Sequence, residues 1–312
     1  MKIGVFIHLF EKTLFDEFSN YIKNVLEIFD DVIIIFTLTN NEESISFYTN
    51  IIMNYFNGLK TNNFSLNVIY IENKGVDIYS FFRQIQFVRT NNIKLDFVLK
   101  IHTKISNNPR INGCWRKQLI EPLVDLNNLQ IIKNIFENLN INDPIRPTSK
   151  YRSANTKKIY EIGYIASQKC IFQRKYDISF KSNLRGILNV CNKFKNIQEN
   201  YLDFIGGSMF WINYSIIDKY LSEELIQYFS KDLSYGKPPS NFNNDIYPEY
   251  VFERLITGPL CFNYTNILIN DNITENINTN YKPEVFSFYS PSALCNQFYK
   301  NELNNLTNII NS

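Results

Sequence analysis

The sequence predicts an α/β fold built on a mainly parallel sheet with helices on both faces. Over residues 1–112, near-continuous apolar runs of strand length alternate with amphipathic helical patterns. A strand that is apolar on both faces belongs in a sheet covered by helices on each side. With 312 residues and 45% hydrophobic content, the chain has enough apolar material for a large core.

The first 112 residues are expected to form four strands and three helices. The strand-like runs are 2–10, 31–38, 65–72 and 96–101, and the helical patterns are 14–29, 42–56 and 78–89. In such a sheet, ligands bind outside the carboxyl ends of the strands, at a switch in strand order. We therefore expect three segments to meet at that edge: His8, the stretch ENKGVD (72–77) and the stretch HTK (102–104).

The pattern changes after residue 112, so we place a boundary there. The expected elements are a helix, a polar loop, two strands and two further helices, at 114–139, 140–158, 161–167, 203–212, 216–229 and 248–256. We expect a first half at 1–112, a second half at 113–270 and a weakly patterned, Asn-rich tail at 271–312.

Composition excludes several classes of protein. A formal net charge of +2 gives no support for nucleic-acid binding. The five cysteines are widely spaced and lack C-x-x-C spacing, which argues against structural zinc and a disulfide framework and favours reduced thiols in the cytoplasm. No stretch has the pattern of a signal peptide or an integral membrane segment.

Two motifs offer candidate ligand-binding residues in the first half. Gly75 permits a backbone shape that side chains disfavour, and Asp77 stands at an expected helix start, either as a cap or as an acceptor for a ribose or base. The strand at 96–101 leads directly into His102 and Lys104, two side chains that can carry positive charge. They are either ligand-binding cations or members of a structural ion pair.

Two further motifs lie in the second half. The stretch DFIGGSMFW brings Gly206 and Gly207 close to Trp211, which fits a close approach to a ligand or a glycine bulge beside a buried indole. Glu249 and Glu253 are four residues apart, on one face of a short helix. They are either solvated helical charges or candidate acid–base groups.

Taken in order, these motifs resemble the rhamnan synthesis protein F family of glycosyltransferase-like proteins. The matching segments span about residues 2–258 and read VFIHLF, NKGVDIYSFF, DFVLKIHTKIS, WRKQL, IGYIAS, FIGGSMFW and FERL. Three positions depart from the family pattern. Val76 replaces an arginine, Gly207-Ser208 replaces Gly-Thr, and Tyr250 replaces a histidine.

The resemblance implies a GT-A-like fold, in which 1–112 is a nucleotide-sugar-binding half merged with a smaller acceptor-binding half. Most GT-A enzymes end the corresponding strand in an Asp-x-Asp motif that holds Mg²⁺ or Mn²⁺. Here that position reads His102-Thr103-Lys104. The resemblance therefore implies that protein cations replace the metal, and that no divalent ion is required.

The resemblance also assigns candidate roles. The donor would be a UDP- or dTDP-linked sugar, most directly L-rhamnose, and the acceptor a glycan. Glu253 would be the catalytic base with Glu249 as the alternative, and Lys104 would act on the leaving diphosphate. The donor-binding set would be His8, Asn73, Gly75, Asp77, His102, Thr103, Lys104, Gly206, Gly207 and Trp211.

Two alternatives remain at this level. One is a transferase of the same fold for another sugar, such as N-acetylglucosamine or glucose. The other is a catalytically silent glycan-binding protein, which the missing Asp-x-Asp motif would suit. The sequence leaves the oligomeric state open, with a homodimer as one option, and predicts a cytoplasmic location.

Overall fold

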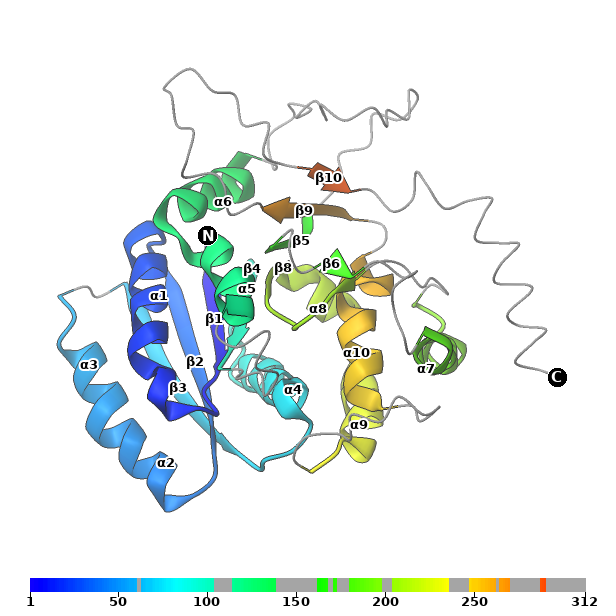
Figure 1. Ribbon diagram of the computed structural model, residues 1–312, viewed down its shortest axis with the longest axis horizontal. Coiled ribbons are helices and arrows are strands. Elements are labelled where there is room, and N and C mark those ends of the chain that lie inside the picture. Colours follow the sequence, from blue (N-terminus) through cyan, green and yellow to red (C-terminus); the bar gives the residue numbers. More distant parts are fainter. Residues whose placement is uncertain are drawn as a thin grey trace.

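The computed structural model describes residues 1–60, 63–103, 114–138, 162–167, 171–172, 180–197, 204–235, 247–261, 264–269 and 287–289. Within these residues the main sheet has eight strands (Figure 1). Their spatial order is β10 (Ser287–Tyr289), β9 (Thr265–Ile269), β5 (Ile162–Ser167), β8 (Phe210–Asn213), β4 (Phe97–His102), β1 (Ile3–His8), β2 (Val32–Thr39) and β3 (Phe64–Ile71).

Strand direction establishes the fold class. The first four strands of the chain pair in parallel in the order β4-β1-β2-β3, and β8 runs antiparallel between β4 and β5. The predicted α/β class with a Rossmann-like, mainly parallel sheet is confirmed, and the arrangement is consistent with a GT-A fold. Strands from both expected halves join in this one sheet, while the expected boundary near residue 112 lies outside the described residues.

Helices cover both faces of the sheet (Figure 1). One face packs against α1 (Phe15–Ile28), α5 (Cys114–Val124) and α6 (Leu126–Asn138). The other face packs against α4 (Val76–Thr90), and α9 (Glu223–Asp232) and α10 (Pro248–Thr257) pack against α4 in turn. The remaining described α-helices are α2 (Glu42–Phe47), α3 (Met53–Asn57), α7 (Phe180–Lys193) and α8 (Tyr214–Tyr220). A two-stranded sheet pairs β6 (Ile171–Phe172) with β7 (Phe204–Ile205).

Four predicted elements are each divided in the structure. The helix at 42–56 becomes α2 and α3, joined by a π-helical segment at Tyr48–Ile52. The helix at 114–139 is interrupted at Asp125, whose carboxylate accepts hydrogen bonds from the backbone amides of the next helix start. The helix at 216–229 becomes α8 and α9 because Ser222 caps the amide of Leu225. The strand at 203–212 is broken by a turn at 206–209, so only β8 enters the main sheet.

Trp211 corrects one expectation about the site. It is fully buried, and its indole Nε1 donates a hydrogen bond to the Leu123 carbonyl over 3.0 Å. Its ring packs against Phe29 and Phe136, on the face covered by α1, α5 and α6. Successive strand residues point to opposite faces, so Phe210 faces α4 while Trp211 faces away from it. Trp211 therefore belongs to the core and not to a sugar pocket.

Candidate functional site

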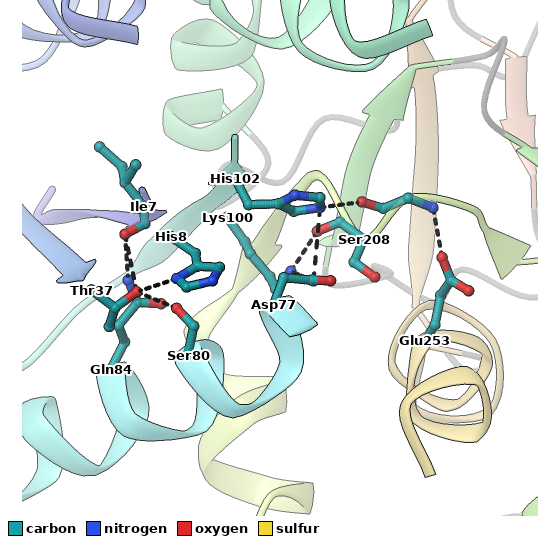
Figure 2. Close-up of polar contacts among 11 residues, drawn as sticks. Ile7, His8, Thr37, Asp77, Ser80, Gln84, Lys100, His102, Ser208 and Glu253 are labelled. Atoms are coloured by element: carbon teal, nitrogen blue, oxygen red, sulfur yellow. Dashed lines mark hydrogen bonds and ion pairs between the residues drawn. The ribbon is translucent and has the colours of Figure 1, made fainter. Parts of the chain in front are cut away.

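A buried polar cluster lies at the carboxyl ends of β1 and β4. The strand order switches direction there, because β1 leads to β2 on one side and the chain returns from β3 to β4 on the other. His8 of β1 is the register partner of both His102 of β4 and Thr37 of β2. The two histidines of the chain thus lie side by side at the edge where such sheets bind ligands (Figure 2).

His8 is held as a neutral imidazole. Its Nδ1 lies 3.1 Å from Thr37 Oγ1, which also contacts the Ser80 hydroxyl of α4. Burial lowers the pKa of His8 from about 6.5 to about 4; the nearby Asp77 carboxylate opposes this shift and the Lys100 ammonium adds to it. At neutral pH this side chain offers uncharged nitrogens to its surroundings.

Helix α4 presents a polar stripe to the sheet. Asp77, Ser80 and Gln84 follow one another at helical spacing and are all buried. The Gln84 side-chain amide donates to the carbonyl of Ile35 over 2.8 Å and to that of Ile7 over 3.3 Å. A helix packed on a sheet normally turns an apolar stripe inward, so this stripe marks a specialised polar contact.

Lys100 is the centre of the cluster, although the motif analysis did not single it out. Its Nζ lies 2.5 Å from Asp77 Oδ2 and donates to the Ser208 carbonyl over 2.8 Å (Figure 2). Both charged side chains are almost completely buried. The signal was present in the sequence as K-x-H, since residues two apart on a strand point to the same face.

His102 joins the same cluster. Its Nε2 lies 2.8 Å from the Gly207 carbonyl and 3.8 Å from Asp77 Oδ2. Asp77 therefore contacts two basic side chains of β4. The expectation that it also accepts a hydrogen bond from a donor nucleoside stays a prediction.

Two turns with left-handed backbone flank the cluster. The first is Gly75 and Val76, with φ of 62° and 53°, and the second is Gly207 and Ser208, with φ of 87° and 54°. A valine in this region is strained because it is β-branched. Such strain collects at functional sites more often than elsewhere, which supports both turns as parts of the site.

The neighbouring loop residues take separate places. Thr103 forms two hydrogen bonds with the segment at and after the end of β1. Its amide donates to the His8 carbonyl, and its Oγ1 accepts from the Glu11 amide. Asn73 is exposed in the loop after β3, and Gly206 is buried within the second turn. Lys104 lies outside the described residues, so its predicted contact with a diphosphate remains a prediction.

The two carboxylates of α10 both bind backbone amides. Glu253 Oε1 accepts from the Gly207 amide over 2.6 Å, and Glu249 Oε1 accepts from the Ser234 amide over 2.6 Å. Glu253 Oε2 lies 3.5 Å from Arg254 Nη1, whereas Glu249 Oε2 is buried with no hydrogen-bond partner among the described residues. Burial raises the pKa of Tyr250, and the nearby carboxylates of Glu253 and Glu249 raise it further. The phenol of Tyr250 is therefore protonated at neutral pH.

Within the described ranges, no group of three or more His, Cys, Asp and Glu side chains has an arrangement that holds a metal ion. None of the helices in those ranges is both long and apolar enough to cross a bilayer.

Fold and site together define an α/β protein with a Rossmann-like sheet and a charged, buried cluster at its ligand-binding edge. The chain belongs to the rhamnan synthesis protein F family, whose model matches residues 1–255. This confirms the resemblance and gives the chain a glycosyltransferase-type role in polysaccharide synthesis. No curated protein and no solved structure matches the chain.

Proposed function

We propose that this protein transfers L-rhamnose from a UDP- or dTDP-linked donor to a glycan acceptor in the cytoplasm. Membership of the rhamnan synthesis family supports the transfer of a sugar. The observation that carries the proposal is the polar cluster of His8, Lys100 and His102 at the switch in strand order. Nucleotides are typical ligands at this position in α/β sheets.

In this proposal, positive side chains at the end of β4 stabilise the leaving nucleoside diphosphate. The bond between the anomeric carbon and the diphosphate breaks as the acceptor oxygen attacks, so negative charge builds up on the diphosphate. A preorganised cation lowers the energy of that charge as a bound metal would. Lys104 is the proposed cation, and His102 lies at the strand end that leads to it.

Glu253 is the proposed base that removes the proton from the acceptor hydroxyl. Its Oε1 accepts from the Gly207 amide, so Oε2, which lies 3.5 Å from Arg254 Nη1, is the oxygen proposed to receive the proton. Glu249, one helical turn earlier, is the alternative, because its Oε2 has no hydrogen-bond partner among the described residues.

The first experiment compares nucleoside diphosphate release from dTDP-L-rhamnose, UDP-N-acetylglucosamine and UDP-glucose, with and without a glycan acceptor.

Turnover of dTDP-L-rhamnose alone would support the proposal. Turnover of another donor would support transferase activity but would show that the transferred sugar is not L-rhamnose. Binding of glycan without turnover or nucleotide affinity would indicate a silent binding protein. We expect activity to persist after treatment with EDTA, because side-chain cations are proposed to take the place of a divalent metal ion. Activity that is lost with EDTA and restored by Mn²⁺ would refute this part of the proposal.

Substitutions on α10 test the base. Glu253→Gln keeps an oxygen that can accept from the Gly207 amide but loses the basicity. We expect it to retain donor affinity and to slow transfer by about a hundred- to ten-thousand-fold. The matched control is Glu249→Gln, one turn away on the same helix face. If only Glu249→Gln abolishes transfer, Glu249 is the base. If both variants transfer sugar at nearly the normal rate, neither carboxylate of α10 is the base.

A further inference from the structure

The two left-handed turns are joined by one side chain from the middle of a strand. Lys100 Nζ reaches Asp77, the residue directly after the first turn, and the carbonyl of Ser208 in the second turn. His102, two residues further along β4, lies within hydrogen-bond distance of the carbonyl of Gly207. Side chains of β4 therefore contact both the second turn and the residue directly after the first.

Helix α10 closes this connection from the other side. Glu253 accepts from the Gly207 amide of the second turn, and Glu249 accepts from the Ser234 amide. The Ser234 carbonyl in turn accepts from the Gly75 amide of the first turn over 2.7 Å. Figure 2 shows Asp77, Lys100 and His102 on one side of the second turn and Glu253 on the other.

Stability alone does not explain an ion pair in this place. Lys100 is 3% exposed, and its Nζ lies 5.5 Å from the Phe81 ring centroid and 5.8 Å from that of Phe210. Removing a lysine and an aspartate from water has a large cost, and apolar residues of similar volume often stabilise a core as well or better. What an apolar pair cannot do is hold the Ser208 carbonyl and a strained turn in a fixed place.

We propose that Lys100 is a positioning residue that holds the two left-handed turns in a fixed relation, so that sugar transfer depends on it more than nucleotide affinity does. The second half of this inference rests on the proposed transferase function. The first turn begins the helix expected to meet the donor nucleoside, and the second lies beside the proposed base. Misplacing reacting groups by about 1 Å can slow a reaction by about a hundredfold.

The test replaces the ion pair by a neutral pair. Lys100→Met alone leaves the Asp77 carboxylate buried without its partner and is expected to destabilise the fold. The decisive variant is therefore the double substitution Asp77→Asn with Lys100→Met, which leaves neither member of the ion pair charged. Asparagine also keeps an oxygen that can accept the hydrogen bond predicted from the donor nucleoside, so that contact is not removed by the substitution. Its matched control is Glu17→Gln with Arg116→Met, because that ion pair is also largely shielded, joins α1 to α5 and contacts neither turn.

Three quantities are compared: dTDP affinity by calorimetry, kcat and KM for dTDP-L-rhamnose, and hydrogen–deuterium exchange of peptides covering 72–78 and 204–210. We expect the neutral pair to fold, to lose less than about tenfold in dTDP affinity and to lose about a hundredfold or more in kcat. Exchange should accelerate by about tenfold or more in both turn peptides, since each loses a charge-assisted contact. The control should change none of these quantities.

Two results would overturn the inference. The first is unchanged exchange in the turn peptides, which would mean that Lys100 only compensates the charge of Asp77. The second is a loss of dTDP affinity as large as the loss of kcat, which would assign the pair to nucleotide binding. If the wild type neither binds dTDP nor turns over any donor, the transferase proposal fails, and the exchange measurement alone decides whether Lys100 holds the turns.

Discussion

Acid should destabilise this protein through His8 in a defined pH range. The imidazole has a pKa of about 4 in the fold and about 6.5 when the chain is unfolded, chiefly because burial disfavours the charged form. Between these values the unfolded chain binds a proton that the folded protein does not. The free energy of unfolding therefore loses the contribution of His8 as pH falls from 6.5, and the loss is complete near pH 4.

The size of the effect follows from the two pKa values. At about 1.36 kcal/mol per pH unit, the difference corresponds to about 3 kcal/mol of unfolding free energy. That is a large fraction of the roughly 5–15 kcal/mol by which domains are stable. The nearby Asp77 and Lys100 act on the His8 pKa in opposite directions, so the loss of hydration on burial accounts for the depression.

Urea denaturation of the wild type and of His8→Asn between pH 4 and 7.5 measures this contribution. The Asn amide can keep a hydrogen bond to Thr37 and does not titrate, so its stability curve should be flatter by about 3 kcal/mol across the range. Residue 8 is the one difference between the two proteins, so the difference between their two curves reports the contribution of His8. Parallel curves for the two proteins would refute the depressed pKa.

Further substitutions have expected results of defined sign. Val76→Gly should raise the unfolding free energy by about 1 kcal/mol, because relief of left-handed strain exceeds the entropy cost of glycine. Gly75→Ala should lower it by about 1–3 kcal/mol, since the new Cβ would lie 2.6 Å from Leu233 Cδ1. Trp211→Phe should lower it by at least about 1 kcal/mol, because the Leu123 carbonyl loses its donor, while dTDP affinity stays unchanged. Urea denaturation checks all three, and the opposite sign in any one, or weaker dTDP binding by the Trp211 variant, would contradict its stated cause.

The sheet was predictable because its central strands, β1 and β2, are almost entirely apolar and buried on both faces. β1 is completely buried and β2 almost completely, as expected for central parallel strands, and this pattern needs no knowledge of distant contacts. Of the residues placed at the carboxyl edge by the strand-end rule, His8, Asp77 and His102 lie together there, while Lys104 is outside the described residues. Trp211 was misassigned because a residue next to a glycine turn can point to either face, and that choice depends on the register of β8 with β4.

Lys100 was missed for a different reason. The K-x-H spacing places Lys100 on the same face as His102, but it does not identify the partner of the lysine, because Asp77 is 23 residues away on a helix. The roles of Thr37, Ser80 and Gln84 could not be predicted for the same reason. Their hydrogen bonds form only where α4 packs on the sheet, so the sequence pattern does not show their partners. Sequence patterns identify elements and strand ends, while a polar cluster between elements depends on long-range packing.

Glu253 of α10 can both hold the turn at Gly207 and act as the proposed base. A carboxylate has two oxygens, and in Glu253 one accepts from the Gly207 amide while the other lies 3.5 Å from Arg254 Nη1. An alanine at this position would remove the hydrogen bond and the base together, so lost activity would not distinguish the two roles. Glutamine separates them, because its carbonyl can still accept from Gly207 while its amide cannot accept a proton from the acceptor. Unchanged exchange in residues 204–210 combined with lost transfer would therefore assign Glu253 to the chemistry, whereas faster exchange with proportionally slower transfer would assign it to holding the turn.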